Sequence, residues 1–228
     1  PKATGLVGLE EKVTAVAVSK SGTWVAAGGE GGGVRVWNAL SPTSAFSLHV
    51  GGGERPHPGA VTAVTFDADG KYLVTAGGGV VRAWAASARW TGENLKADVD
   101  GEVFDLGVGL DGDKLYAGTR ARGVRVWDFP GLGNPTAPAD GKLTGPGFTR
   151  IAVGEKWCAA LNAAGKYGFW DGTSNGAFAG GHMTDTTAFP TATADIAFPR
   201  DRDNGGFRRP DTNRHVFAAG NADGTVLV

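Results

Sequence analysis

The chain has 228 residues, of which 39 are glycine, 41% are hydrophobic and 20% are charged, and its net charge at pH 7 is −1. This balance of charge gives no reason to expect a nucleic acid or an anionic membrane surface as a partner bound through bulk electrostatics. The single cysteine, Cys158, excludes a disulfide within the chain and any site that needs several cysteines, and no stretch reaches transmembrane length.

Short apolar runs, rich in β-branched residues, follow one another along the chain with glycine-bearing turns between them. We predict strands at 13–18, 24–27 and 34–37 in a first unit, and at 61–66, 71–76 and 80–84 in a second. The third run of each unit ends in a tryptophan, and the chain repeats this at Trp37, Trp84, Trp127 and Trp170, which are 47, 43 and 43 residues apart. A fixed period in the low forties is typical of propeller blades.

The later units follow the same plan. The third and fourth end in the runs 123–128 and 166–171, and a fifth is legible at 194–198, 215–220 and 221–228, one residue short of its expected tryptophan. Trp24 and Trp157 each precede the tryptophan of their unit by thirteen residues. The similarity between units therefore extends beyond one motif.

These runs resemble the WD-repeat β-propeller family, whose blades are four-stranded antiparallel sheets and whose third strand typically ends in Trp-Asp. Residues 127–128 and 170–171 match that pair, whereas Trp37 and Trp84 match only at the tryptophan. The resemblance implies an all-β fold, a β-propeller with about five blades in these residues. We expect one domain over 1–228, with units at about 9–56, 57–98, 99–143, 144–188 and 189–228, the last of them truncated.

The number of blades in the ring is a separate question. The resemblance implies a closed ring of most often seven blades, which would need about 300 residues at this period. Because the chain supplies not quite five units and begins with Pro1, we expect a portion of a seven-bladed ring whose remaining blades come from the same longer chain. The alternative is a five-bladed ring in which residues 3–8 pair with the last blade as its missing outer strand.

Family blades are often braced by a polar network of His, Ser or Thr, Asp and Trp. His57 occupies the matching histidine position of the second blade, but glycines fill the turn at 77–79 where its aspartate partner would stand, and only Asp223 keeps the aspartate position. We therefore expect the blades to depend on packing more than on such braces, with the four repeating tryptophans filling the gaps between blades. Cys158 is expected to be a small buried hydrophobe.

Candidate contacts for protein partners fall on turns and loops, where a rigid frame usually carries recognition. In the family topology, one face gathers the segments that lead into each first strand and the turns between second and third strands. It would present Glu30, Arg55, His57, Arg120 and Arg122. On the opposite face, an irregular loop at 199–214 surrounds an aromatic anchor with charge, a composition typical of interaction hot spots. Its candidates are Arg202, Phe207, Arg208 and Arg209.

The sequence shows no spacing of residues that favours catalysis or metal binding. The Asp- and Gly-rich stretches at 67–70, 98–101 and 111–113 resemble fragments of calcium loops, but they lack the remaining oxygen ligands and are interpreted as turns. We expect a cytoplasmic, non-catalytic scaffold without metal or cofactor, bound to other proteins or a multi-subunit assembly and not to nucleic acid or membrane. One alternative is an enzyme, or the regulatory domain of one, with its site in the propeller channel or outside this segment. Another is nucleic-acid binding.

Overall fold

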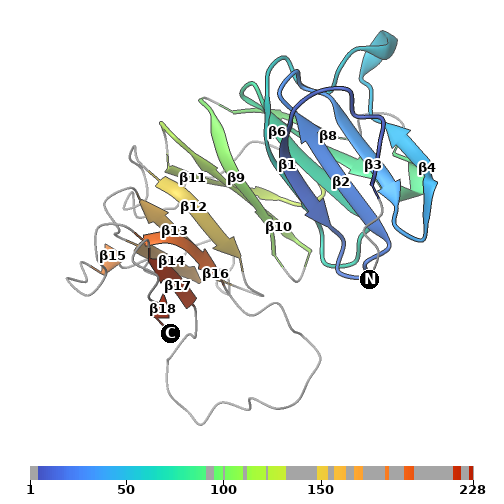
Figure 1. Cartoon of the computed structure of the whole chain (residues 1–228). Coiled ribbons are helices and arrows are strands. Elements are labelled where there is room, and N and C mark those ends of the chain that lie inside the picture. Colours follow the sequence, from blue (N-terminus) through green and yellow to red (C-terminus); the bar gives the residue numbers. More distant parts are fainter. Residues whose placement is uncertain are drawn as a thin grey trace.

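The computed structural model shows a fan of five β-sheets arranged side by side along an arc (Figure 1). It describes residues 5–90, 95–99, 101–109, 112–121, 123–131, 148–153, 157–162, 167–171, 183–184, 193–197, 218–221 and 226–227. Within these ranges the only helical elements are the single 3-10 turns η1 (Gly51–Gly53) and η2 (Ala86–Ala88). No helix in this part of the chain has the length and apolar character needed to cross a membrane.

Each sheet is antiparallel, and each strand pairs with its neighbour along the chain. Blade 1 contains β1 (Val13–Val18), β2 (Trp24–Gly29), β3 (Val34–Asn38) and β4 (Ser41–Ser47). Blade 2 contains β5 (Val61–Phe66), β6 (Tyr72–Gly77), β7 (Val80–Ala85) and β8 (Leu95–Asp98). The described strands of blade 3 are β9 (Val103–Val108), β10 (Lys114–Thr119) and β11 (Gly123–Asp128).

Two further sheets complete the arc. Blade 4 contains β12 (Phe148–Val153), β13 (Trp157–Asn162), β14 (Tyr167–Asp171) and β15 (Met183–Thr184). The described strands of blade 5 are β16 (Thr193–Ala197), β17 (Ala218–Asn221) and β18 (Val226–Leu227). The predicted all-β architecture of antiparallel blades is confirmed, and each sheet lies within one of the five repeat units.

The first strand of every blade has the same irregularity near its start. The register shifts across its second residue in β1, β5, β9, β12 and β16, so that Thr14, Thr62, Phe104, Thr149 and Ala194 are each passed over in the pairing. A bulge of this kind bends the strand and strengthens its twist. In blade 1 the bulge directs the Thr14 hydroxyl to the carbonyl oxygen of Val61 on β5, 2.6 Å away, and so joins blades 1 and 2.

Neighbouring blades pack a face bearing large side chains against a face bearing small ones. Between blades 2 and 3, the Trp127, Leu115 and Val103 side chains of blade 3 lie against small residues of blade 2 such as Ala76 and Ala83. Trp84 occupies the equivalent position between blades 1 and 2, where it is completely buried. Trp37, Trp84 and Trp127 are all buried, and Trp84 and Trp127 lie between neighbouring blades. The Trp170 side chain lies outside the described part of the structure.

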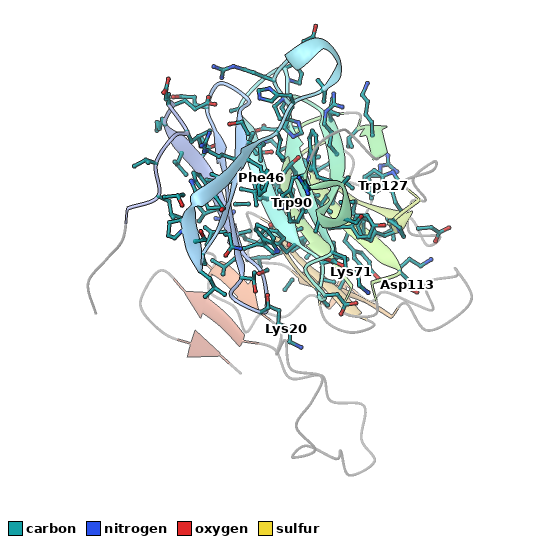
Figure 2. The ribbon with its side chains drawn as sticks, turned by 90° about the vertical axis from the view of Figure 1, so that its right-hand side faces the viewer. Lys20, Phe46, Lys71, Trp90, Asp113 and Trp127 are labelled. Carbon is teal, nitrogen blue, oxygen red and sulfur yellow. The ribbon has the colours of Figure 1, made fainter. Side chains whose placement is uncertain are left out.

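A second set of aromatic contacts, not predicted from the sequence, lies between blades 1 and 2 and between blades 2 and 3, near the starts of β2 and β6. Trp90, just after η2 in blade 2, meets Trp24 of blade 1 edge-on at a centroid distance of 5.4 Å. Phe129 of blade 3 meets Tyr72 of blade 2 in the same way at 5.2 Å. Figure 2 shows Trp90 beside Phe46 in the interior between the first two sheets. Edge-to-face pairs of this kind add to the stability gained by burial alone.

Candidate protein-interaction face

The turns between second and third strands lie beside the segments that lead into the first strands, as the family topology implies. A main-chain hydrogen bond fixes this arrangement at equivalent positions of two blades. The amide of Glu30 donates to the carbonyl oxygen of Lys12 in blade 1, at 2.9 Å, and the amide of Arg120 donates to that of Glu102 in blade 3, at 3.0 Å. The backbone hydrogen bonds therefore fix the Cα positions from which these side chains extend. We call the surface they form the charged face.

The same two positions carry opposite charges that are swapped between blades. In blade 1, Lys12 Nζ lies 4.0 Å from a carboxylate oxygen of Glu30. In blade 3 the acid precedes the first strand and the base lies in the turn after the second strand, with Arg120 Nε 2.6 Å from Glu102 Oε2. All four side chains are at least half exposed. Because exposed pairs contribute only about 0 to 1 kcal/mol to folding, these charges can turn towards a partner at little cost in stability.

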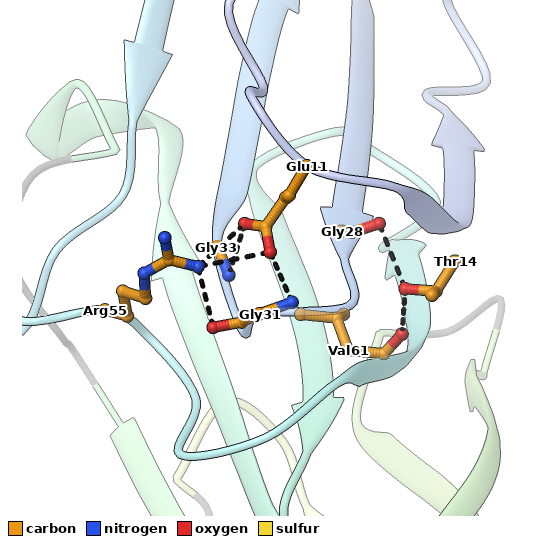
Figure 3. A network of polar contacts seen from close by, with 7 residues as sticks. All are labelled: Glu11, Thr14, Gly28, Gly31, Gly33, Arg55 and Val61. Carbon is orange, nitrogen blue, oxygen red and sulfur yellow. Dashed lines mark hydrogen bonds and ion pairs between the residues drawn. The ribbon is translucent and has the colours of Figure 1, made fainter.

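Arg55 forms the third charged contact of this face and joins the connection between β4 and β5 to the turn between β2 and β3 of blade 1 (Figure 3). Its Nη1 atom lies 3.1 Å from Glu11 Oε2 and 2.8 Å from the carbonyl oxygen of Gly31. The Glu11 carboxylate also accepts hydrogen bonds from the amides of Gly31 and Gly33, so it caps the turn between β2 and β3. Sequence reasoning found Arg55 but missed Glu11, which falls at no position of the repeat motif.

His57 does not belong to the charged face, because its side chain is 2% exposed. Its Nε2 atom lies 2.8 Å from the Thr75 hydroxyl, which in turn accepts a hydrogen bond from Trp84 Nε1 at 3.0 Å. His57 therefore takes part in a polar brace, although its aspartate partner is missing. The Nδ1 atom lies 3.1 Å from the carbonyl oxygen of Gly77, so a backbone acceptor takes the place of the missing aspartate.

The environment of His57 keeps its ring neutral. Burial lowers the pKa of His57 to about 4, the hydrogen bond with Gly77 opposes this, and the nearby positive charge of Arg82 adds to it. A neutral ring that donates from Nδ1 to Gly77 accepts at Nε2 from Thr75, which leaves the Thr75 oxygen to accept from Trp84. Every polar group in this series of hydrogen bonds, from Gly77 through His57 and Thr75 to Trp84, is then paired. His57 is a structural residue and is not available for contact with a partner.

In blades 1 and 3 the indole N–H of the repeating tryptophan has no threonine hydroxyl to donate to, because Ala27 and Ala117 stand where blade 2 has Thr75. The Trp37 indole of blade 1 donates instead to the carbonyl oxygen of Val7, at 3.0 Å. Trp127 Nε1 of blade 3 is buried without a hydrogen-bond partner. For the three blades whose side chains can be compared, the His-Thr-Trp brace is thus present in blade 2 alone.

The opposite face carries the turns between first and second strands, and Lys20, Lys71 and Asp113 mark it in Figure 2. The stretch 67–70 is a tight turn: the Gly70 amide donates to the carbonyl oxygen of Asp67, and Asp67 Oδ1 accepts from the Tyr72 amide at 2.8 Å. Over the residues with described placement, no three His, Cys, Asp or Glu side chains gather as a metal site would require. Cys158 is buried, and burial raises the pKa of its thiol.

Several predicted site residues lie outside the described part of the chain. These are Arg122 on the charged face, Asp223 in the last blade, and Arg202, Phe207, Arg208 and Arg209 in the 199–214 loop. Their assignments stay predictions. Of the remaining candidates, the structure brings Glu30, Arg55 and Arg120 to exposed positions on turns or on the segments that lead into first strands.

Antiparallel sheets that fan out along an arc, with Trp84 and Trp127 each buried against the preceding sheet, define a β-propeller fold. The family model described as "WD domain, G-beta repeat" matches residues 5–38 and 54–85, which contain the first two repeating tryptophans. No curated protein sequence gives a match. The first two units therefore match the WD repeat, and the chain as a whole has the β-propeller fold of the solved WD-repeat structures.

Two solved structures illustrate the similarity. One, titled "Structure of U3-55K", is 17% identical with a TM-score of 0.60, and the alignment covers 73% of this chain and 50% of that one. The other, titled "Crystal structure of RRP9 WD40 repeats", is 15% identical with a TM-score of 0.58, and the alignment covers 72% and 49%. At these identities the likeness concerns the fold. The chain spans about half the length of these two proteins.

Proposed function

We propose that this protein is a non-catalytic scaffold that binds other proteins through the charged face of its propeller. The observation that carries the proposal is the set of exposed acids and bases anchored on hydrogen-bonded turns, formed by Lys12, Glu30, Glu102 and Arg120 with Arg55 between them. A surface whose backbone is already ordered loses little conformational entropy on binding. Its side chains nevertheless remain free to exchange one charged partner for another.

The chemistry of the described residues supports a binding role over a catalytic one. The two groups with the most strongly perturbed pKa values, His57 and Cys158, are both buried and packed into the fold. A general base or nucleophile has to reach a substrate, whereas these two side chains cannot be approached from solvent. The charged side chains that can be approached stand on turns, where propellers present recognition residues.

The proposal is tested by swapping charges within each pair. The double variants Lys12→Glu with Glu30→Lys, and Glu102→Arg with Arg120→Glu, preserve an ion pair in each blade but invert the pattern that a partner meets. A swap on the opposite face, Asp69→Lys with Lys71→Asp, serves as the matched control because that pair is equally exposed. Partners captured from the native source by each protein are quantified by mass spectrometry.

We expect the two swaps on the charged face to reduce capture of the same partners, most clearly at low salt where surface charges are least screened. Melting temperatures should stay within about 3 °C of the parent, because surface substitutions rarely change stability by more than 0.5 kcal/mol. Capture that falls only with the Asp69 and Lys71 swap would place the interaction on the opposite face. Unchanged capture by all three variants would refute the proposal for both faces.

A further inference from the structure

Arg55 on the charged face has one end of its guanidinium group fixed and the other end open. Its Nη1 atom lies 3.2 and 3.1 Å from the two oxygens of the Glu11 carboxylate and 2.8 Å from the carbonyl oxygen of Gly31 (Figure 3). Both hydrogens of Nη1 therefore have acceptors. Among the residues that the structure describes, Nε and Nη2 of Arg55 have none, and the side chain is 60% exposed.

The fixed end of the guanidinium sets the direction of the open one. Glu11 is itself held in place, because its carboxylate accepts hydrogen bonds from the amides of Gly31 and Gly33 and its side chain is only 14% exposed. A planar guanidinium bonded through Nη1 to this turn directs Nε and Nη2 away from the turn. These two atoms form an edge that binds a carboxylate through two parallel N–H···O bonds. Because the side chain is already ordered, a ligand loses less conformational entropy on binding to it.

The other basic side chains described on the charged face lack this open edge. Arg120 Nε lies 2.6 Å from Glu102 Oε2, so an acid of the same chain already occupies the edge that Arg55 leaves open. Lys12 offers a single ammonium group beside Glu30, without two donors in one plane. Arg55 is therefore the described side chain of this face that is arranged to bind a carboxylate from another molecule.

The surface next to Arg55, across blade 2, carries no charge. We call it the uncharged strip, and it consists of Pro58, Gly59, Ala60, Gly78 and Gly79. Ala60 and Gly78 stand at the two repeat positions that carry an ion pair in blades 1 and 3. Pro58 and Gly78 are exposed, and the other three residues are half-buried. Because the exposed turn is made of glycine, the main chain of another molecule can approach it closely.

Main-chain hydrogen bonds make the uncharged strip continuous with the blades on both sides. The amide of His57 donates to the carbonyl oxygen of Gly32 in blade 1, at 3.2 Å. On the other side, the amide of Val99, which leads into blade 3, donates to the carbonyl oxygen of Gly79, at 2.7 Å. The order along the face is therefore Arg55 on the turn of blade 1, then the uncharged strip, then the ion pair of blade 3.

We propose that Arg55 binds an aspartate or glutamate side chain of a partner protein, in an extended segment that continues over the uncharged strip with small, uncharged residues. The inference rests on the proposed function, because it assigns a ligand chemistry to part of the charged face. Charge complementarity specifies the occupant, since a guanidinium offers only donors and a carboxylate accepts from two of them at once. Charged residues at the following positions of the segment would find no opposite charge on the strip.

Selection from a phage-displayed library of random peptides supplies a ligand for the test. The library is selected on the complete protein and on its Arg55→Lys variant, which keeps the positive charge but loses the two parallel donors. Arg120→Lys is the matched control, with the same substitution on the same face. We expect peptides with Asp or Glu followed by small residues from the parent and from Arg120→Lys, but not from Arg55→Lys. Arg55→Gln repeats the test should the lysine variant fold poorly.

Fluorescence anisotropy then gives the Kd of a selected peptide and of its analogue in which Asn or Gln replaces the acid. The analogue should bind the parent and Arg120→Lys at least about 10-fold more weakly, whereas the two peptides should differ by less than about 3-fold on Arg55→Lys. Equal discrimination by Arg55→Lys and the parent would overturn the proposal, as would loss of discrimination by Arg120→Lys or selection of peptides without an acid. Partner capture that still falls with the Lys12–Glu30 and Glu102–Arg120 swaps would then leave the proposed function standing without an anchor at Arg55.

Discussion

Replacing Thr75 by valine should test the polar brace of blade 2 directly. Valine has nearly the shape of threonine, so the change removes the hydroxyl while it keeps the packing. The hydroxyl is the link between His57 Nε2, 2.8 Å away, and Trp84 Nε1, 3.0 Å away. Both side chains are buried and have no access to water as a substitute. Thr75→Val therefore leaves one buried acceptor and one buried donor unpaired.

The cost can be worked out from those two groups. An unpaired buried polar group costs about 1–3 kcal/mol, so the pair sets a range of about 2–6 kcal/mol. Trp127 in blade 3 shows that this fold accommodates an indole N–H without a partner, which favours the lower part of the range. We expect Thr75→Val to reduce the free energy of unfolding by about 2–4 kcal/mol at pH 7.

Urea unfolding followed by tryptophan fluorescence provides the measurement. Thr65→Val is the matched control, because the Thr65 hydroxyl is only half-buried and its contact with the carbonyl oxygen of Phe66 is long, at 3.4 Å. That control should change stability by less than about 0.5 kcal/mol. If Thr75→Val costs no more than Thr65→Val, the hydrogen-bonded chain through His57 does not stabilise the blade and the reasoning fails.

Three further predictions concern other contacts. The pKa of His57 is about 4 in the folded protein against 6.5 for an unperturbed ring, so the unfolded state binds more protons between these two pH values. The free energy of unfolding should therefore fall by up to about 3 kcal/mol as the pH drops from 6.5 to 4. His57→Gln should make the free energy of unfolding less dependent on pH in this range. Gly28→Ala should cost about 1–3 kcal/mol in urea unfolding, whereas Gly51→Ala should be close to neutral. The reason is that a Cβ at Gly28 would lie 2.3 Å from a valine methyl of the next blade, while that at Gly51 meets open space. A double-mutant cycle of Glu11→Gln and Arg55→Ala should give a coupling free energy of about 0.5–1 kcal/mol, which added salt should reduce. Additive effects of the two substitutions would show that the Glu11–Arg55 ion pair does not contribute to stability.

The strands and the buried tryptophans could be predicted from the sequence because both depend on local, repeated signals. A run of β-branched residues between glycine turns is sufficient to place a strand such as β5. The recurrence of Trp37, Trp84 and Trp127 at the end of each third strand places one large buried side chain in each of the first three blades. Each of these patterns can be recognised within a single repeat, without reference to the neighbouring blade. The strands and their period therefore followed from the pattern, and the propeller fold followed from the resemblance that this pattern supports.

The polar brace at His57 and the edge-to-face aromatic pairs could not be predicted, because they depend on backbone groups and on residues outside the repeat positions. The acceptor that replaces an aspartate at His57 is the backbone carbonyl of Gly77, which any residue could supply. Trp90 falls out of phase with the repeat and reaches Trp24 through a backbone turn in which its own φ is 59°. Glu11 acts through a turn of the chain twenty residues further on. These contacts arise only once two segments are brought together in space.

The pairing of every strand with its neighbour along the chain has a consequence for how the protein is made. Each sheet can close as soon as its own residues leave the ribosome, since none waits for a strand synthesised much later. Each new blade can then pack its tryptophan against the alanines of the preceding blade, which has already folded. Assembly of these five sheets can thus proceed blade by blade in the order of synthesis.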